Sequence, residues 1–464
     1  MSPSPTLKVS LIGGGGIRTP LVIFGINELA RTLGIAEIVL YDPDSDRVEL
    51  MAALGRAIVA REDGSLKVTI ARRIEEAIEG CAFIMHSIRV GGIRSRAADE
   101  LASIRNGYAG QETTGPAGAA MALRTVPIVL EQAGLVERLN PDAWMVSFTN
   151  PAGLVTQAVS SHTGAKIVGI CDTPTELIHN LTRALGASAD RVACEYVGLN
   201  HLGWIRRVRL DGEDITERVL NDDALLAAAY TVPLFDPEMI RQLGLIPSEY
   251  LYFYYCRRRA LDNQVAHGGS RGAEVEKLNK DLLKTLDGHL RANDPSLAVD
   301  AYAAYLNRRS GSYMRLEGHG GSAFDADAAF DIDPFRVASG YHIIAMDVIR
   351  ALCSDAPSHI IVNTKNRGTI SDLRDTDVIE TSCRISRAGI VPEPLGPLPD
   401  ETRGLITAIK AYERAAIKAA RALPTDPLAR LTARKAFLLH PAIQDWEASD
   451  PLLRDLLDPT CIHC

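Results

Sequence analysis

Short apolar runs alternate with helical patterns along the first 190 residues of the chain. The segments between the apolar runs carry apolar residues at three-to-four spacing, as helices packed on a sheet should. Such alternation is typical of a parallel sheet with crossover helices. We predict strands at residues 8–13, 37–42, 67–71, 83–88, 144–149 and 166–171, and helices at residues 21–33, 45–61, 116–139 and 151–161. We therefore expect a Rossmann-like, doubly wound α/β domain over residues 1–190.

The pattern changes after about residue 191, where strands and helices no longer alternate regularly. Residues 191–210 are predicted to form one long extended segment. Further strands are predicted at residues 360–365 and 378–386, and helices at residues 274–290, 335–353, 401–423 and 427–439. We expect an α+β domain over residues 191–464 that carries the substrate site and the contacts between subunits.

Composition and charge exclude several classes of protein. Of the 464 residues, 46% are apolar and 23% are charged, which is typical of a folded chain. The net charge of −8 leaves no basic surface for nucleic acid or an anionic membrane. The eight cysteines are scattered, so we expect reduced thiols. With neither a targeting segment nor an apolar stretch of about 20 residues, we expect a cytoplasmic protein.

A glycine-rich turn follows the first predicted strand. Gly13, Gly14, Gly15 and Gly16 permit a tight turn and let a pyrophosphate approach the start of the next helix. The second strand ends at Asp42, whose carboxylate can accept hydrogen bonds from an adenosine ribose. The alternative is a simple glycine turn with a surface aspartate. We predict binding of NAD rather than its 2′-phosphorylated form.

A metal site is one interpretation of Cys171 and His201. Cys171 and Asp172 end a predicted strand, and Asn200 and His201 follow about thirty residues later. A thiolate and an imidazole are a soft and a borderline ligand for a divalent ion. Core residues are the alternative. The terminal Cys-Ile-His-Cys sequence at residues 461–464 also invites a metal interpretation, but a frayed tail explains it better.

Four further segments are candidates for substrate contacts. The basic run at residues 89–96 follows the fourth strand, where ligands bind in doubly wound sheets, although it could be a solvated loop. The polar turn containing Glu112 could cap a helix, and Asn150 could fix a turn. The aromatic cluster at residues 250–255 could be a core element or could supply a phenol that acts as a base.

Read together, these motifs resemble glycoside hydrolase family 4. The resemblance rests on the glycine turn followed by RVGGIRSRAADE, GQETTGP, SFTNPAG, VGICDTP, VGLNHLGW, SEYLYFYY and HIIVNTKNRGTISDL. The family is the NAD-dependent exception to hydrolysis by two carboxylates. The resemblance implies bound NAD⁺, a divalent metal that is usually manganese, and cleavage by oxidation at sugar C3, deprotonation at C2, elimination, water addition and re-reduction.

The resemblance also implies roles for individual residues. Cys171 and His201 match the metal ligands, Tyr250 matches the base that removes the C2 proton, and Asp172 matches the group that protonates the leaving group. The neighbouring tyrosines leave the position of the base open. Arg96, Glu112 and Asn150 match substrate-side positions, and Arg271 is a weaker candidate for the group at sugar position 6.

The substrate implied by the resemblance is a 6-phospho-β-glucoside, although two motifs depart from the family pattern. Gly16 stands where phosphoglycosidases of the family have serine, and Arg18 could supply a different anion contact. Cys-Asp-Thr-Pro matches neither subgroup's form of that motif. The alternatives are the same chemistry on an unphosphorylated or differently charged α- or β-glycoside, a lactate/malate-type dehydrogenase, or a non-enzymatic NAD sensor. The family resemblance further implies a homodimer or homotetramer.

Overall fold

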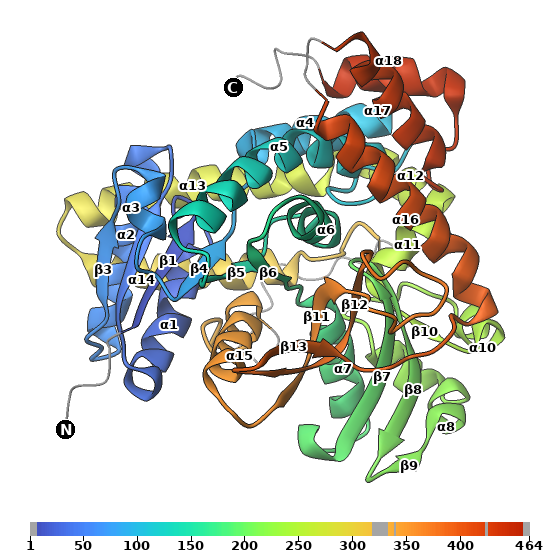
Figure 1. Ribbon diagram of the computed structural model, residues 1–464, viewed down its shortest axis with the longest axis horizontal. Coiled ribbons are helices and arrows are strands. Elements are labelled where there is room, and N and C mark those ends of the chain that lie inside the picture. The colour runs from blue at the N-terminus through green and yellow to red at the C-terminus, as the bar shows by residue number, and fades with distance from the viewer. Residues whose placement is uncertain (1–6, 318–332, 338–339, 423–425, 458–464) are drawn as a thin grey trace.

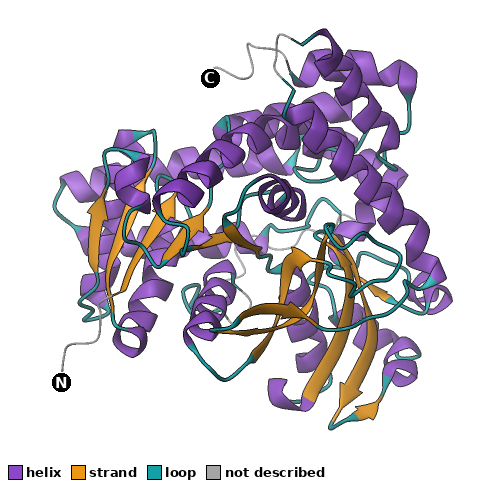
Figure 2. Ribbon diagram, in the orientation of Figure 1, coloured by secondary structure: helices purple, strands orange, loops and turns teal. Residues whose placement is uncertain are grey.

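The computed structural model describes residues 7–317, 333–337, 340–422 and 426–457, so the terminal Cys-Ile-His-Cys sequence lies outside the described residues. The described chain contains a nine-stranded sheet and a four-stranded sheet, and helices cover both faces of the larger one (Figures 1 and 2). The strand order of the larger sheet is β13-β12-β11-β6-β5-β4-β1-β2-β3.

The predicted Rossmann-like domain is confirmed. Its parallel strands are β1 (Leu7–Ile12), β2 (Ile35–Tyr41), β3 (Lys67–Ile70), β4 (Phe83–His86), β5 (Trp144–Ser147) and β6 (Lys166–Gly169). The order 3-2-1-4-5-6 is that of doubly wound dinucleotide-binding folds. The helices are α1 (Thr19–Leu33), α2 (Ser45–Arg61), α3 (Ile74–Ile78), α4 (Gly92–Arg105), α5 (Gly115–Leu139), α6 (Ala152–His162) and α7 (Thr173–Ala184).

The loop interpretation of residues 89–96 is wrong for its second half, because α4 begins at Gly92. Gly91 precedes the helix in a left-handed conformation, with φ of 78°. The buried face of α4 consists of small and polar side chains, including Ala97, Asp99 and Ser103. A helix with such a buried face shows no apolar periodicity, so the sequence pattern did not reveal it.

The second part of the chain also differs from its prediction. Residues 191–210 form an antiparallel hairpin rather than one extended segment, because β7 (Val192–Leu199) turns at Asn200 and His201 into β8 (Leu202–Leu210). Its small sheet is completed by β9 (Glu213–Asp214) and β10 (Ile246–Pro247). The division into domains at residue 190 stays a prediction.

Three later strands extend the larger sheet beyond β6. They are β11 (Ser358–Lys365), β12 (Val378–Ser386) and β13 (Gly389–Pro392), and all pair antiparallel. Figure 1 shows β12 beside β7, where the two sheets meet. Chain segments that are far apart in the sequence therefore share one sheet.

The remaining helices surround both sheets (Figure 2). They are α8 (Thr216–Leu220), α9 (Asp223–Ala228), α10 (Pro237–Leu243), α11 (Tyr252–Tyr255), α12 (Arg257–His267), α13 (Arg271–Arg291), α14 (Pro295–Gly311), α15 (Tyr341–Cys353), α16 (Asp400–Ala420), α17 (Pro427–Leu439) and α18 (Trp446–Leu456). The helix predicted at residues 335–353 begins only at Tyr341, because residues 335 and 336 lie in a turn.

One helix qualifies the prediction that the chain lacks a long apolar stretch. By length and hydropathy, α5 could cross a membrane, since a window of its sequence has a mean hydropathy of 1.3. Half of that window is buried, and α5 packs against α4, α6 and α16. The packing is that of a core helix.

Two buried histidines are held neutral by the fold. His86 ends β4, and its ring nitrogens contact Gln132 Oε1 at 2.6 Å and Thr149 Oγ1 at 2.8 Å. Burial lowers the pKa of His86 to about 4 and that of His440, at the end of α17, to about 3. In the unfolded chain both imidazoles regain their usual pKa of about 6.5.

These two histidines should therefore lower the free energy of unfolding as the pH drops below about 6.5, because they then bind more protons in the unfolded chain than in the folded one. Glu317 and Glu380, whose pKa burial raises to about 7, act in the opposite direction. The limit is about 1.4 kcal/mol per pH unit for each histidine. The free energy of unfolding of His86→Gln should therefore fall less than that of the wild type between about pH 7.5 and about pH 5, as measured by urea unfolding. His267→Gln, at an exposed site, is the control. A fall in His86→Gln equal to that of the wild type would contradict the assignment.

Candidate active site

Most of the predicted site residues lie at the carboxyl edge of the parallel strands. The glycine turn follows β1, the Arg89 segment follows β4, Asn150 follows β5 and Cys171 follows β6. Doubly wound sheets bind their ligands at this edge, where the strand order reverses between β1 and β4. The sheet order thus gathers segments that are separated by more than 150 residues in the sequence.

The glycine turn packs closely against the backbone that follows β4, so its first position requires glycine. Gly13 has φ of 93°, and a Cβ atom there would lie 2.1 Å from the carbonyl oxygen of Ser87. Asp42 braces the turn, since its carboxylate accepts hydrogen bonds from the Gly15 amide at 2.9 Å and the Asp44 amide at 3.0 Å. A carboxylate has about four acceptor positions, so Asp42 can also accept from ribose hydroxyls.

Cys171 and His201 meet in the site, as the metal interpretation requires. Cys171 Sγ lies 3.3 Å from His201 Nε2, and both side chains are buried. Bond lengths of about 2.3 Å to sulfur and about 2.0 Å to nitrogen would place two ligands of one ion roughly 3.0–3.5 Å apart. The pair therefore fits a divalent ion. Within the described ranges, no cluster of three or more His, Cys, Asp or Glu residues is arranged to hold a metal ion.

The backbone of His201 is held in an unusual conformation. Its φ of 59° lies in the left-handed region, at the second position of the two-residue turn between β7 and β8. Glycine is the usual residue where a turn requires positive φ, because other residues are strained there. The turn therefore stores strain in order to present an imidazole at this place.

Among the tyrosines of residues 250–255, Tyr250 is the one whose ring stacks on His201 of the Cys171–His201 pair. The two ring centroids lie 3.7 Å apart, with 5° between the ring planes. Its hydroxyl lies 3.1 Å from that of Tyr313, which donates a hydrogen bond of 2.6 Å to Glu249 Oε1. Burial raises the pKa of Tyr250, and the negative charges of Glu112 and Glu249 raise it further. A base at this position therefore needs a nearby cation.

Asp172 lies next to Cys171 and begins α7. Burial raises the pKa of its carboxyl, although the positive charge of Arg18 and a hydrogen bond with Tyr341 oppose this effect. The Arg18 guanidinium lies 3.9 Å from the centre of the Tyr341 ring. Arg18, Asp172 and Tyr341 therefore form one cluster beside Cys171.

Glu112 holds two arginines of the predicted substrate side. Its carboxylate forms ion pairs with Arg89 at 2.6 Å and with Arg96 at 3.1 Å, and Arg96 also pairs with Glu100 at 2.8 Å. Burial would raise the pKa of Glu112, but Arg89 and Arg96 hold it below its usual value. Glu112 is thus ionised and orients the two guanidinium groups.

Arg271 belongs to a larger group of guanidinium charges. It donates hydrogen bonds to Ser312 Oγ at 2.6 Å and to the Arg309 carbonyl at 2.7 Å. Burial lowers the pKa of Arg271, and the charges of Arg309 and Arg96 lower it further. Burial likewise lowers the pKa of Arg309, with contributions from Arg18 and Arg96. We name Arg18, Arg96, Arg271 and Arg309 the arginine cluster.

Sequence reasoning missed Arg309, which lies on the unpredicted helix α14 and carries no motif. Among the described residues, no carboxylate lies within ion-pair distance of Arg18 or Arg309. The charges of Asp172 and Glu112 instead act on Arg18. Arg309 donates a hydrogen bond of 2.9 Å to the Tyr305 hydroxyl. The site thus gathers four guanidinium groups, and within the described part of the chain the side-chain partner of Arg309 is a neutral hydroxyl. Such a site favours an anionic ligand.

The comparison with known proteins agrees with this geometry. A model described as "Family 4 glycosyl hydrolase" matches residues 8–187, and one described as "Family 4 glycosyl hydrolase C-terminal domain" matches residues 196–443. The chain belongs to glycoside hydrolase family 4. Membership of family 4 makes the chain a glycosidase.

This family 4 enzyme is similar to several named proteins in sequence and in structure. It is 30% identical to the 6-phospho-beta-glucosidase of Escherichia coli, over 94% of this chain and 96% of that protein. A structure of the Thermotoga maritima 6-phospho-beta glucosidase with manganese, NAD⁺ and glucose-6-phosphate has a TM-score of 0.78, 28% identity, and coverage of 97% of this chain and 98% of that one. A malate dehydrogenase from Plasmodium falciparum, 14% identical with a TM-score of 0.50, covers 89% of this chain and 98% of its own and shares the fold alone.

Glu380 on β12 is a second residue that sequence reasoning missed in this family 4 enzyme. Its carboxylate accepts hydrogen bonds from Asn363 at 2.8 Å, Asn200 at 3.1 Å and Tyr196 at 3.3 Å. Burial raises the pKa of Glu380 to about 7. Glu380 anchors Asn200, which precedes His201 in the turn. The sequence around Glu380 carries no signal of this contact. The predicted substrate residue Asn150 lies elsewhere, half-buried after β5.

Both Cys171→Ser and His201→Gln should weaken Mn²⁺ binding by at least about tenfold, since each removes one of the two donors. Isothermal titration calorimetry of the family 4 enzyme with Mn²⁺ measures this effect. Cys194→Ser is the matched control, because Cys194 is a half-buried cysteine on β7 outside the pair. Mn²⁺ affinity that is unchanged in both site variants would contradict the metal assignment.

Proposed function

We propose that this family 4 enzyme is an NAD⁺- and Mn²⁺-dependent 6-phospho-β-glucosidase. The observation that carries the proposal is the arginine cluster, which reaches the Cys171–His201 pair through two of its members. The charge of Arg18 acts on Asp172, and the charge of Arg96 acts on Tyr250. A phosphate dianion would bind the guanidinium groups through charge-assisted hydrogen bonds. The names of the relatives support a phosphorylated β-glucoside, and the glucose-6-phosphate in the Thermotoga maritima structure is the sugar that its hydrolysis would release.

The side chains have separate tasks in the proposed reaction. NAD⁺ at the glycine turn supplies reversible hydride transfer at sugar C3, which acidifies the proton on C2. Mn²⁺ held by Cys171 and His201 stabilises the negative charge that develops on the sugar oxygens. Tyr250 takes the C2 proton at its hydroxyl oxygen, and Asp172 gives a proton to the oxygen of the leaving group. Asn150 and Arg96 orient the sugar, while Glu112 fixes Arg96.

The loss of a phosphate-contacting serine at Gly16 is offset by the arginines. Arg18 begins α1 and lies over Tyr341, and Arg271 and Arg309 approach from α13 and α14. A guanidinium group can bind a phosphate through two parallel hydrogen bonds, which a serine hydroxyl cannot do. The phosphate site thus rests on cations where the family pattern has a hydroxyl.

The remaining features of the proposal concern assembly and location. We propose a homodimer or homotetramer, supported by exposed apolar side chains on α17 and α18, which include Leu428, Leu431 and Trp446. We further propose a cytoplasmic location, supported by free thiols at all the described cysteines. The proposed division of labour between residues 1–190 and 191–464 is cofactor binding and substrate binding.

The substrate class can be tested with nitrophenyl glucosides in the presence of NAD⁺, Mn²⁺ and a reductant. We expect kcat/KM for the 6-phospho-β-glucoside to exceed that for the unphosphorylated β-glucoside by at least about 100-fold, which corresponds to about 2.7 kcal/mol. The 6-phospho-α-glucoside tests the anomer. No net NADH should form. Equal rates with and without phosphate would contradict the phosphate assignment, and stoichiometric NADH would indicate a dehydrogenase.

Arg309→Gln should raise KM for the 6-phospho-β-glucoside by at least about tenfold, because it removes a charged contact to phosphate. The small activity on the unphosphorylated glucoside should not change. Arg308→Gln is the matched control, since Arg308 precedes Arg309 on α14 and is exposed. Steady-state kinetics that give the same KM for both variants would show that Arg309 does not contact the phosphate.

A further inference from the structure

We infer that Thr113, oriented by Gln111, is a positioning residue that determines which ring nitrogen of His201 carries the proton. The hydroxyl of Thr113 would keep the proton on Nδ1 and leave Nε2 with a free lone pair toward Cys171. The inference rests on the proposed function, since the lone pair serves the metal that the pair would bind. It concerns a neutral imidazole and involves no change of charge.

The orientation of the Gln111 amide is fixed by the backbone. Gln111 Oε1 accepts hydrogen bonds from the amide of Thr113 at 2.7 Å and the amide of Thr114 at 2.8 Å. If the amide were flipped, its NH₂ group would face two N–H donors, and no hydrogen bond could form. The atom nearest Thr113 is therefore an oxygen that can only accept. Gln111 is 7% exposed, so water cannot replace these contacts freely.

The Thr113 hydroxyl has one proton for two contacts. Its Oγ1 lies 2.8 Å from Gln111 Oε1 and 2.6 Å from His201 Nδ1. Because Gln111 Oε1 only accepts, the hydroxyl must donate there, and Thr113 Oγ1 must then accept from an Nδ1–H group. With the opposite assignment, two oxygen atoms would face each other at 2.8 Å without a proton between them. Only the first assignment gives every contact one proton.

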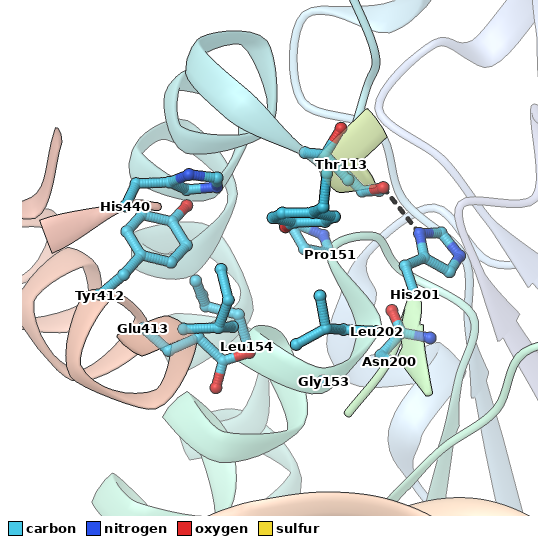
Figure 3. A pocket seen from close by; sticks show the side chains of 13 residues that line it. Thr113, Pro151, Gly153, Leu154, Asn200, His201, Leu202, Tyr412, Glu413 and His440 are labelled. Atoms are coloured by element: carbon cyan, nitrogen blue, oxygen red, sulfur yellow. Dashed lines mark hydrogen bonds between the residues drawn. The ribbon is translucent and has the colours of Figure 1, made fainter. Parts of the chain in front are cut away.

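The proton on Nδ1 determines the state of Nε2, on the opposite side of the imidazole. A neutral imidazole has one N–H group, so Nε2 carries a lone pair where Cys171 Sγ lies at 3.3 Å. Figure 3 shows Thr113 and His201 joined by their hydrogen bond at the wall of a cavity of about 20 Å³. The stacked ring of Tyr250 opposes rotation of the imidazole. Metal-binding histidines commonly donate their other N–H in this way, which fixes their tautomer.

The segment that carries Thr113 is itself well anchored. Glu112 is tied to Arg89 and Arg96, and Thr114 precedes the first residue of α5. Although Thr114 is a typical capping residue, its side chain makes no capping hydrogen bond, and the amide of Gly115, the first residue of α5, donates to His440 Nε2 at 3.2 Å instead. From sequence, the polar turn could equally have been a helix cap. In the structure its Thr113 side chain contacts His201.

The tautomer can be measured directly on the metal-free wild-type enzyme. With ¹⁵N-labelled histidine, long-range ¹H–¹⁵N correlation spectra distinguish Nδ1–H from Nε2–H, and His201→Gln identifies the resonances of His201. We expect the Nδ1–H form in the wild type and a mixture in Thr113→Val. Observation of the Nε2–H form in the wild type would overturn the inference.

Metal titration provides the second measurement. Thr113→Val should weaken Mn²⁺ affinity by about 10- to 100-fold, whereas Thr113→Ser, which keeps the hydroxyl, should stay within about threefold of the wild type. Thr114→Val is the matched control at the neighbouring threonine, and it should bind Mn²⁺ as the wild type does. Thermal unfolding without metal reports any general loss of structure.

The outcomes separate this inference from the proposed function. Wild-type enzyme that fails to bind Mn²⁺ would contradict the proposed function, while the tautomer would still test the inference. Wild-type binding with equal Mn²⁺ affinity in Thr113→Val, or an equal loss in Thr113→Val and Thr113→Ser, would overturn the role of the hydroxyl. If Thr113→Val did not fold, the wild-type tautomer and the Thr113→Ser affinity would decide.

Discussion

The contact of 3.3 Å between Cys171 Sγ and His201 Nε2 joins the two parts of the chain, and the rest of the site is arranged around it. Cys171 follows β6, whereas His201 sits in the turn of the β7–β8 hairpin. Their separation depends on how the two sheets meet at β12 and β7. Glu380 on β12 bonds to Asn200 and thereby ties the hairpin turn to the larger sheet. Tyr250 then stacks on His201, so the position of the proposed base follows from the same contact.

The site contains a group of positive charges, whereas the molecule as a whole is negatively charged. The chain carries a net charge of −8, and the global field therefore repels an anionic substrate. The arginine cluster supplies a local positive region, and ion pairs with Glu100, Glu112 and Glu274 hold two of its members in place. Because burial and the charges of Arg18 and Arg96 lower the pKa of Arg309, an anion bound there would lower the repulsion within the cluster. The proposed phosphorylated substrate would thus bring to the site a negative charge that the molecule as a whole repels.

Much of the larger sheet could be predicted from sequence, because strands buried on both faces are continuous apolar runs. The pattern failed where tertiary packing replaced it. The buried face of α4 is small and polar, and the hairpin turn uses Asn-His rather than a glycine pair, so neither gave a local signal. Ligand chemistry joined Cys171 and His201 as one candidate metal site, with core residues as the alternative, and the motif resemblance favoured the metal. Arg309 and Glu380 reach the site through long-range packing, which a single sequence does not reveal.

The central claim is that Tyr250, stacked beside the Cys171–His201 pair, removes the proton from sugar C2 before the glycosidic bond breaks. The most direct test is turnover of a 6-phospho-β-glucoside that carries deuterium at C2, with the isotope content of the product measured by NMR. The account predicts that the deuterium is exchanged with solvent protons during turnover. A product that retains all of its deuterium at C2 would contradict the account, because direct displacement at C1 never touches that position.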